Sequence, residues 1–216
     1  MRLGRITAAL AAVAAVLALA AGCGGARTGA TGADATISVY STEPRSALTP
    51  GGAGDAGGFC VLSTLLAGLV VYDEQGKPVN EVASSITPND DPTVFTVTLG
   101  HGWTFTDGTP VTARSFTRAW SYAANPANAQ INASYFANIQ GYGDLQRSTD
   151  GTEQLSGLVV TGDESFEIHL SAPGFDTAPE TSARSRSCRC PTRSTTIPTR
   201  HASKPVGNGA YRFSSW

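Results

Sequence analysis

A strong net charge is absent from this sequence of 216 residues, whose acidic and basic side chains nearly balance at −2. Without a basic excess the chain has no electrostatic surface suited to nucleic acid, so we expect no nucleic-acid partner. Histidine is scarce, at three residues, and neither a G-x-S-x-G nor an H-E-x-x-H pattern occurs. These gaps argue against an exported hydrolase, which stays as an alternative. We predict that the protein is not an enzyme and has no catalytic residue.

Metal-ligand spacing is lacking as well. Cys188 and Cys190 are separated by one residue, and His201 follows, but this spacing is poor for zinc and offers no fourth ligand. Cys60 lies in an apolar run, where we expect it to be a small buried hydrophobic side chain. We therefore predict neither a metal site nor any cofactor.

The N-terminus has the plan of a secretory signal. Two arginines are followed by an uncharged apolar run over residues 6–21, which is too short and too rich in alanine to span a membrane comfortably. The run is followed by Gly22 and Cys23, and the ending Ala-Ala-Gly-Cys at 20–23 resembles the bacterial lipobox, whose cysteine is lipidated. We predict a signal peptide over 1–22, lipidation of Cys23 and a flexible tether over 23–34. The alternative is an ordinary signal cleaved nearby, with Cys23 incidental.

Alternating apolar and polar residues predict several strands. Such runs lie at 35–41, 69–72 and 93–99, and a pair at 158–160 and 166–170 flanks a Gly-Asp turn. In the third run, the large apolar side chains fall on one face, which we expect to point inward: Phe95, Val97 and Leu99.

Two stretches favour helices. The first covers 59–67, and the second begins after the N-cap candidate Thr112 and ends near residue 124. The second carries Phe116, Trp120 and Ala123 on one stripe, so it is expected to bury two aromatic rings. Because helices and strands mix without a βαβ rhythm, we predict an α+β fold.

Several phrases, in order, resemble the extracytoplasmic solute-binding proteins of oligopeptide and dipeptide ABC importers, solute-binding protein family 5. The longest is GWTFTDGTPVTA at 102–113, and others are GLVVYD at 68–73, ASYF at 133–136 and PVGNGAY at 205–211. Ser115 stands where the family usually has an acidic residue.

The resemblance implies a two-lobed, periplasmic-binding-protein-like fold with a mixed or antiparallel sheet and helices. Residues 35–176 and 204–216 correspond to the front part of its first lobe, and the second lobe would follow Trp216. The family captures peptides or related solutes for an ABC permease and its ATPase subunits. We therefore expect a peptide ligand, those membrane partners, a lipid anchor on the outer face of the cytoplasmic membrane and a monomeric state. The alternative is a truncated remnant without function.

The same alignment suggests where ligand would bind. Asp55, Ala56 and Gly57 fall in a loop that lines the peptide backbone in family members. Asn132 replaces a tyrosine that often contacts ligand, and Tyr135 lies three residues further on. The alternative for each position is an ordinary loop or surface residue.

Residues 177–203 do not fit the family. They contain no Val, Leu, Phe, Tyr, Trp, Met or Gly, so their composition predicts disorder. The family has Leu-Pro-Leu-Pro and Tyr-Asp-Asp-Pro here, and a shifted reading frame over residues 187–199 can encode these sequences. We hypothesise two compensating frame changes that bracket this segment.

Overall fold

The computed structural model describes residues 38–46, 48–173 and 205–214, and it divides the chain into two units, 1–40 and 41–216. In the first unit, the described residues 38–40 have no regular structure, and Val39 and Tyr40 are exposed. The strand expected over 35–41 is therefore wrong for 38–41, while 35–37 lie outside the described residues. An extended run becomes a strand only when a partner satisfies its backbone, and residues 38–41 have no such partner among the described residues.

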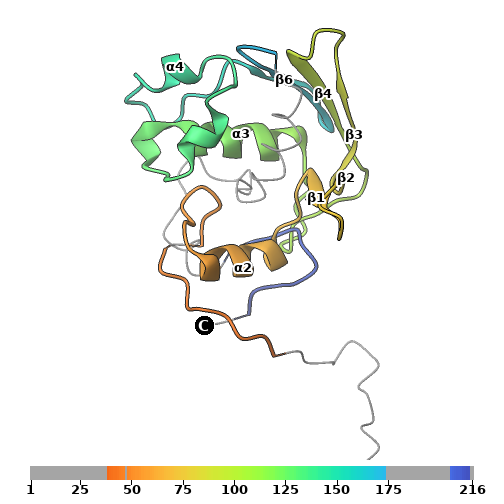
Figure 1. The fold of residues 1–216 in the computed structure, drawn as a ribbon, viewed down its shortest axis with the longest axis vertical. Coiled ribbons are helices and arrows are strands. Elements are labelled where there is room, and N and C mark those ends of the chain that lie inside the picture. Colours follow the sequence, from red (N-terminus) through yellow and green to blue (C-terminus); the bar gives the residue numbers. More distant parts are fainter. Residues whose placement is uncertain (1–37, 47, 174–204, 215–216) are drawn as a thin grey trace, which may run out of the picture. The chain divides into compact units, whose positions relative to one another are not determined.

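The second unit is built on a four-stranded antiparallel sheet (Figure 1). Its order is β3 (Ala83–Pro88), β4 (Val94–Leu99), β6 (Ser165–His169) and β5 (Leu158–Gly162). A smaller sheet pairs β1 (Val70–Tyr72) with β2 (Pro78–Asn80). The strands expected at 69–72, 93–99, 158–160 and 166–170 are all present, which confirms them and the α+β class.

Helix α3 (Ala113–Ala124) packs its apolar stripe on the inner face of the large sheet. Phe116 stacks on Phe166 of β6 with ring centroids 6.2 Å apart, and Trp120 meets Phe166 edge-on at 6.0 Å. The predicted inward face of β4 and the predicted stripe of α3 are both confirmed, because every member is buried: Phe95, Val97, Leu99, Phe116, Trp120 and Ala123.

The start of α3 shows what Ser115 does in place of an acidic residue. The backbone N–H of Thr112 donates to Ser115 Oγ at 3.0 Å, and Ser115 N–H donates to the Thr112 carbonyl at 2.9 Å. Ser115 is completely buried. The first turn of α3 is thus satisfied without a charge.

Three short elements follow α3 and lead back to the sheet. They are η2 (Pro126–Asn128), η3 (Ala133–Phe136) and α4 (Tyr142–Leu145). Phe136 of η3 is buried beside Trp120, with ring centroids 6.0 Å apart. This contact fixes η3 against the main core and thereby places the residues on either side of it.

Helix α2 (Ala56–Leu65) belongs to a second, smaller apolar cluster. It starts and ends earlier than the predicted 59–67, because Asp55 caps its first turn and its last helical residue is Leu65. The expectation that Cys60 is buried is wrong, since its side chain is exposed. The buried stripe of α2 runs through Gly58, Leu62 and Leu65, at helical spacing, and Cys60 falls outside it.

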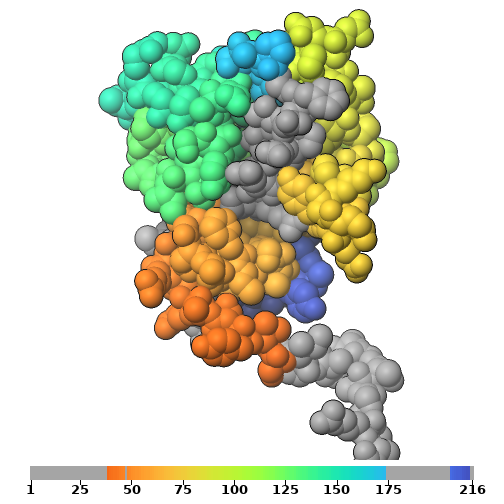
Figure 2. All heavy atoms as spheres, viewed as in Figure 1, coloured from red at the N-terminus to blue at the C-terminus, as the bar shows by residue number. Residues whose placement is uncertain are grey.

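The last described segment, 205–214, is held against the end of α2, and Figure 2 shows the two in contact. Gly209 N–H donates to the Leu65 carbonyl at 2.7 Å, and Asn208 Oδ1 accepts from Ala67 N–H at 3.2 Å. A Cβ at Gly207 would lie 2.0 Å from the Leu65 carbonyl oxygen, so the close approach requires glycine. The Gly-Asn-Gly motif therefore serves as a cap for α2.

Candidate ligand-binding site

Asp55 is the N-cap of α2, and its carboxylate is engaged by three backbone groups. Oδ1 accepts from Gly58 N–H at 2.9 Å, and Oδ2 accepts from Arg45 and Ser46 N–H at 3.2 and 3.3 Å. The bond from Gly58 is the largest influence and holds the pKa of Asp55 below its ordinary value, against a smaller opposing effect of burial. Asp55 thus fastens residues 45–46 to the helix start.

Ala56 and Gly57 lie in the first turn of α2, so the expectation of a loop at these two positions is wrong. Ala56 is exposed, whereas Gly57 is buried. A Cβ at Gly57 would lie 2.2 Å from the carbonyl oxygen of Thr42, and that backbone leaves no room for a larger residue. Of these two, Ala56 is the one that a ligand could touch.

Asn132 connects the loop before α2 to the start of η3. Its backbone N–H donates to the Gly51 carbonyl at 3.2 Å, and its Nδ2 donates to the Ala53 carbonyl at 2.9 Å. A longer contact of 3.5 Å joins Nδ2 to the Pro50 carbonyl. Asn132 is 7% exposed, so this residue is an internal tie rather than a surface loop residue.

Tyr135 lies on η3 and keeps 40% of its surface exposed. Ile131, just before η3, is 61% exposed, and its Cδ1 lies 2.3 Å from where a Cβ on Gly54 would stand. Ile131 therefore covers the backbone of Gly54, on the loop that Asn132 holds. No sequence pattern predicted a role for Ile131, because the exposure of one isoleucine depends on tertiary placement.

The structure thus brings the loop 50–57 next to residues 131–135, although some 75 residues separate them in the chain. The exposed side chains here include Ala56, Ile131, Ser134 and Tyr135, and the one carboxylate, Asp55, is already bonded to backbone amides. No group of three potential metal ligands occurs among the described residues. Such a surface suits contact with a ligand and offers no nucleophile paired with a base. Cys23, Cys188, Cys190 and His201 lie outside the described residues.

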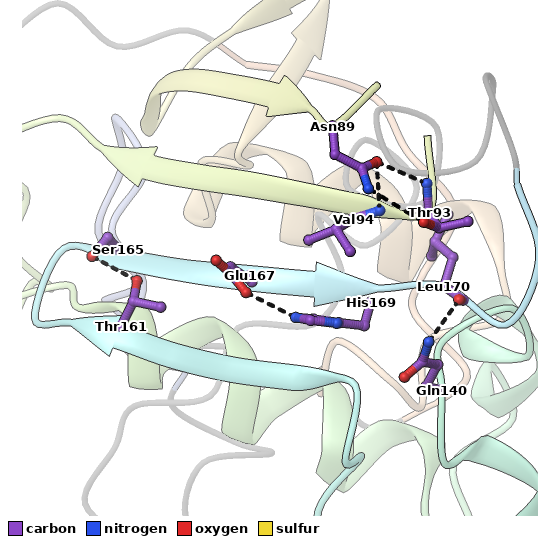
Figure 3. A network of polar contacts seen from close by, with 9 residues as sticks. All are labelled: Asn89, Thr93, Val94, Gln140, Thr161, Ser165, Glu167, His169 and Leu170. Atoms are coloured by element: carbon purple, nitrogen blue, oxygen red, sulfur yellow. Dashed lines mark hydrogen bonds and ion pairs between the residues drawn. The ribbon is translucent and has the colours of Figure 1, made fainter. Parts of the chain in front are cut away.

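A separate polar network crosses the end of the large sheet (Figure 3). His169 Nε2 lies 2.8 Å from Glu167 Oε2 on the solvent side of β6, as expected for a residue between buried Ile168 and Leu170. Gln140 Nε2 donates to the Leu170 carbonyl at 3.0 Å. The first of these contacts lies within β6, and the second ties Gln140 to the residue that follows β6, so neither lies on α2 or η3.

Within the described part of the chain, no helix is both long and apolar enough to cross a membrane.

Comparison with known proteins identifies the family to which the chain belongs. A family model for bacterial extracellular solute-binding proteins, family 5 Middle, matches residues 77–216. The oligopeptide-binding protein OppA of Bacillus subtilis is 31% identical over 134 residues, which is 61% of this chain and 24% of that protein. The periplasmic oligopeptide-binding protein OppA of Escherichia coli is 34% identical over 111 residues, 50% of this chain and 20% of that protein.

Solved structures agree on the fold. Haemophilus influenzae OppA in complex with RPPGFSPFR superposes with a TM-score of 0.70 and 26% identity, over 79% of this chain and 34% of that one. The Escherichia coli murein tripeptide binding protein MppA gives 0.71 and 25%, over 82% and 35%. This chain spans about a third of these structures and a quarter or less of the curated relatives above. Because the family model matches well over half of its length, the chain belongs to the bacterial extracellular solute-binding proteins of family 5.

Proposed function

We propose that this protein captures peptides, or a related solute, for an ABC importer, and that the loop 50–57 with residues 131–135 is the first-lobe part of its binding site. The observation that carries the proposal is the tie between Asn132 and the loop, which unites the two candidate segments. The relatives named above support the ligand class, since several are oligopeptide-binding proteins.

The candidate residues divide into two kinds by exposure. Ala56 and Tyr135 are exposed and available for direct contact with ligand. Three other candidates hold the backbone that presents those contacts. Asp55 caps α2, Gly57 allows a close approach of the Thr42 backbone, and the side-chain amide of Asn132 binds the Ala53 carbonyl. Strand-like backbone pairing would supply affinity, and water-filled pockets would tolerate varied ligand side chains.

The same proposal includes the cellular setting. The protein acts as a monomeric lipoprotein, held through Cys23 on the outer face of the cytoplasmic membrane, and delivers its ligand to a permease with ATPase subunits. It needs no cofactor and performs no chemistry on the ligand. The signal-like residues 1–22 and the family's extracellular character support this placement.

Uptake of a labelled pool of di- to pentapeptides in the native host tests the function. Deleting the gene should lower peptide uptake while uptake of labelled free amino acids stays unchanged, and restoring the gene should restore it. A Tyr135→Ala gene should restore less, whereas Tyr72→Ala, which alters an equally exposed ring on β1, should restore fully. Peptide uptake that does not change on deletion would contradict the proposal and favour a remnant without function.

A further inference from the structure

The turn before α2 contains buried backbone carbonyl groups that need hydrogen-bond donors from elsewhere in the chain. The Thr49 carbonyl accepts from Gly52 and Ala53 N–H, at 3.1 and 3.0 Å, and so closes the turn on itself. The turn itself provides no donor for the carbonyl groups of three other residues, all of which are buried: Pro50, Gly51 and Ala53. Buried carbonyl groups require donors, because water is not there to supply them.

One residue supplies all of those donors. Asn132 offers a backbone N–H to Gly51 and the two hydrogens of its side-chain amide to Ala53 and, at longer range, Pro50. A side-chain amide nitrogen carries two hydrogens, and an aspartate of the same shape carries none.

We infer that Asn132 is a positioning residue that locks the loop 50–54 onto the start of η3 before any ligand arrives. The first-lobe half of the site is therefore preformed, and Asn132 acts on ligand through the loop rather than by touching it. This inference rests on the proposed function only in assuming that the loop 50–54 faces the ligand. The lock itself is a property of the unliganded chain.

A second contact reports whether the lock is closed. Ile131 lies over the Gly54 backbone, with its Cδ1 2.3 Å from the position of a Cβ on that glycine. The methyl protons of Ile131 must then lie close to the α-protons of Gly54. Since Ile131 is exposed, this proximity depends on the loop being held and not on burial in the core.

Nuclear magnetic resonance of the chain without ligand tests the inference. Asn132→Asp keeps the size of the side chain and removes both amide hydrogens. We expect loss of the nuclear Overhauser effect between the Ile131 δ-methyl and Gly54, and at least tenfold faster hydrogen exchange at the amides of residue 132 and Ala53. Exchange at Leu99 and Leu170, whose amides are bonded within the sheet region, should not change.

The matched control is Asn138→Asp, a change of the same chemistry on the exposed surface that follows η3. It should leave both signals as in the wild type. An unchanged Overhauser effect in Asn132→Asp would overturn the inference, and so would equal acceleration at Leu99 and Leu170, which would mean general destabilisation. If Asn132→Asp does not fold, the wild type alone decides: exchange of the Asn132 amide as fast as in an unfolded peptide refutes the lock.

Peptide uptake in the host then separates the two proposals. With an intact transport function, the Asn132→Asp gene should restore less uptake than the Asn138→Asp gene. Loss of the lock in solution without any transport effect would leave the positioning of the loop established and refute its role in capture.

Discussion

Truncation of Trp120 gives the sharpest test of the core that carries the site. The side chain is 1% exposed and lies among three rings, with centroids 6.4 Å from Phe116, 6.0 Å from Phe136 and 6.0 Å from Phe166. Burying a ring of this size contributes several kcal/mol, and rigid aromatic neighbours cannot collapse into the space it leaves. We therefore expect Trp120→Ala to lower the free energy of unfolding by about 3–5 kcal/mol.

Trp120→Phe separates the ring from its polar group. The indole N–H is buried and has no hydrogen-bond partner among the described residues, so phenylalanine removes no bond there. The loss for this variant should be less than half of the loss for alanine, because most of the apolar ring is kept. Equal losses for the two variants would show that the indole nitrogen makes a stabilising bond after all.

Urea unfolding followed by circular dichroism measures both losses, provided that the slope of free energy against urea is shared by the variants. Tyr72→Ala serves as the control, because its ring is 40% exposed, and it should cost about 0.5 kcal/mol or less. A cost below about 1 kcal/mol for Trp120→Ala would refute the reasoning and place the ring at a surface.

Three further predictions concern the ends of the chain and its pH response. Cys23→Ser should abolish incorporation of a labelled fatty acid and release the protein from membranes; equal labelling of wild type and variant would exclude the anchor. Asp55 has a folded pKa below its ordinary 3.8, so its stabilising effect is present above that pH and is lost as pH falls through the lower folded value. Asp55→Asn keeps only one acceptor oxygen, so it should be less stable than the wild type near neutral pH, and the difference should shrink as pH falls below about 4; identical acid profiles would rule out this role. Resequencing the gene over residues 177–203 should reveal Leu-Pro-Leu-Pro and Tyr-Asp-Asp-Pro in the alternative frame, and their absence would make the segment a genuine divergent loop.

Local patterns were sufficient for much of the fold. Thr112 and the stripe through Phe116 and Trp120 fixed both ends and the buried face of α3, because capping and helical period are local properties. The alternation in β4 likewise identified its inward face. Ser38–Ser41 has the same alternation and forms no strand, since pairing is a tertiary property that alternation does not encode.

The candidate site was less accessible to sequence reasoning. The alignment pointed to Asp55 and Asn132, yet their contacts are with backbone groups of this chain, which only coordinates could reveal. Cys60 was expected inside because its neighbours are apolar, and it lies outside because α2 buries only the stripe through Leu62 and Leu65. An apolar run without polar residues marks no face, so its orientation could not be predicted.

The contact between α2 and the last described segment also bears on the proposed frame changes. A helix of ten residues is marginal in water without tertiary support, and α2 contains no charged residue that could add local ion pairs. Part of its support comes from Asn208 and Gly209, which lie about 140 residues further along the chain than the carbonyl and amide groups they bind. A frame change near residue 177 that was never corrected would replace both residues. The lobe could then keep its sheet and α3 while losing the cap on α2. Only a second change before residue 205 preserves that cap, so the hypothesis requires a compensating pair and is refuted by a single lesion.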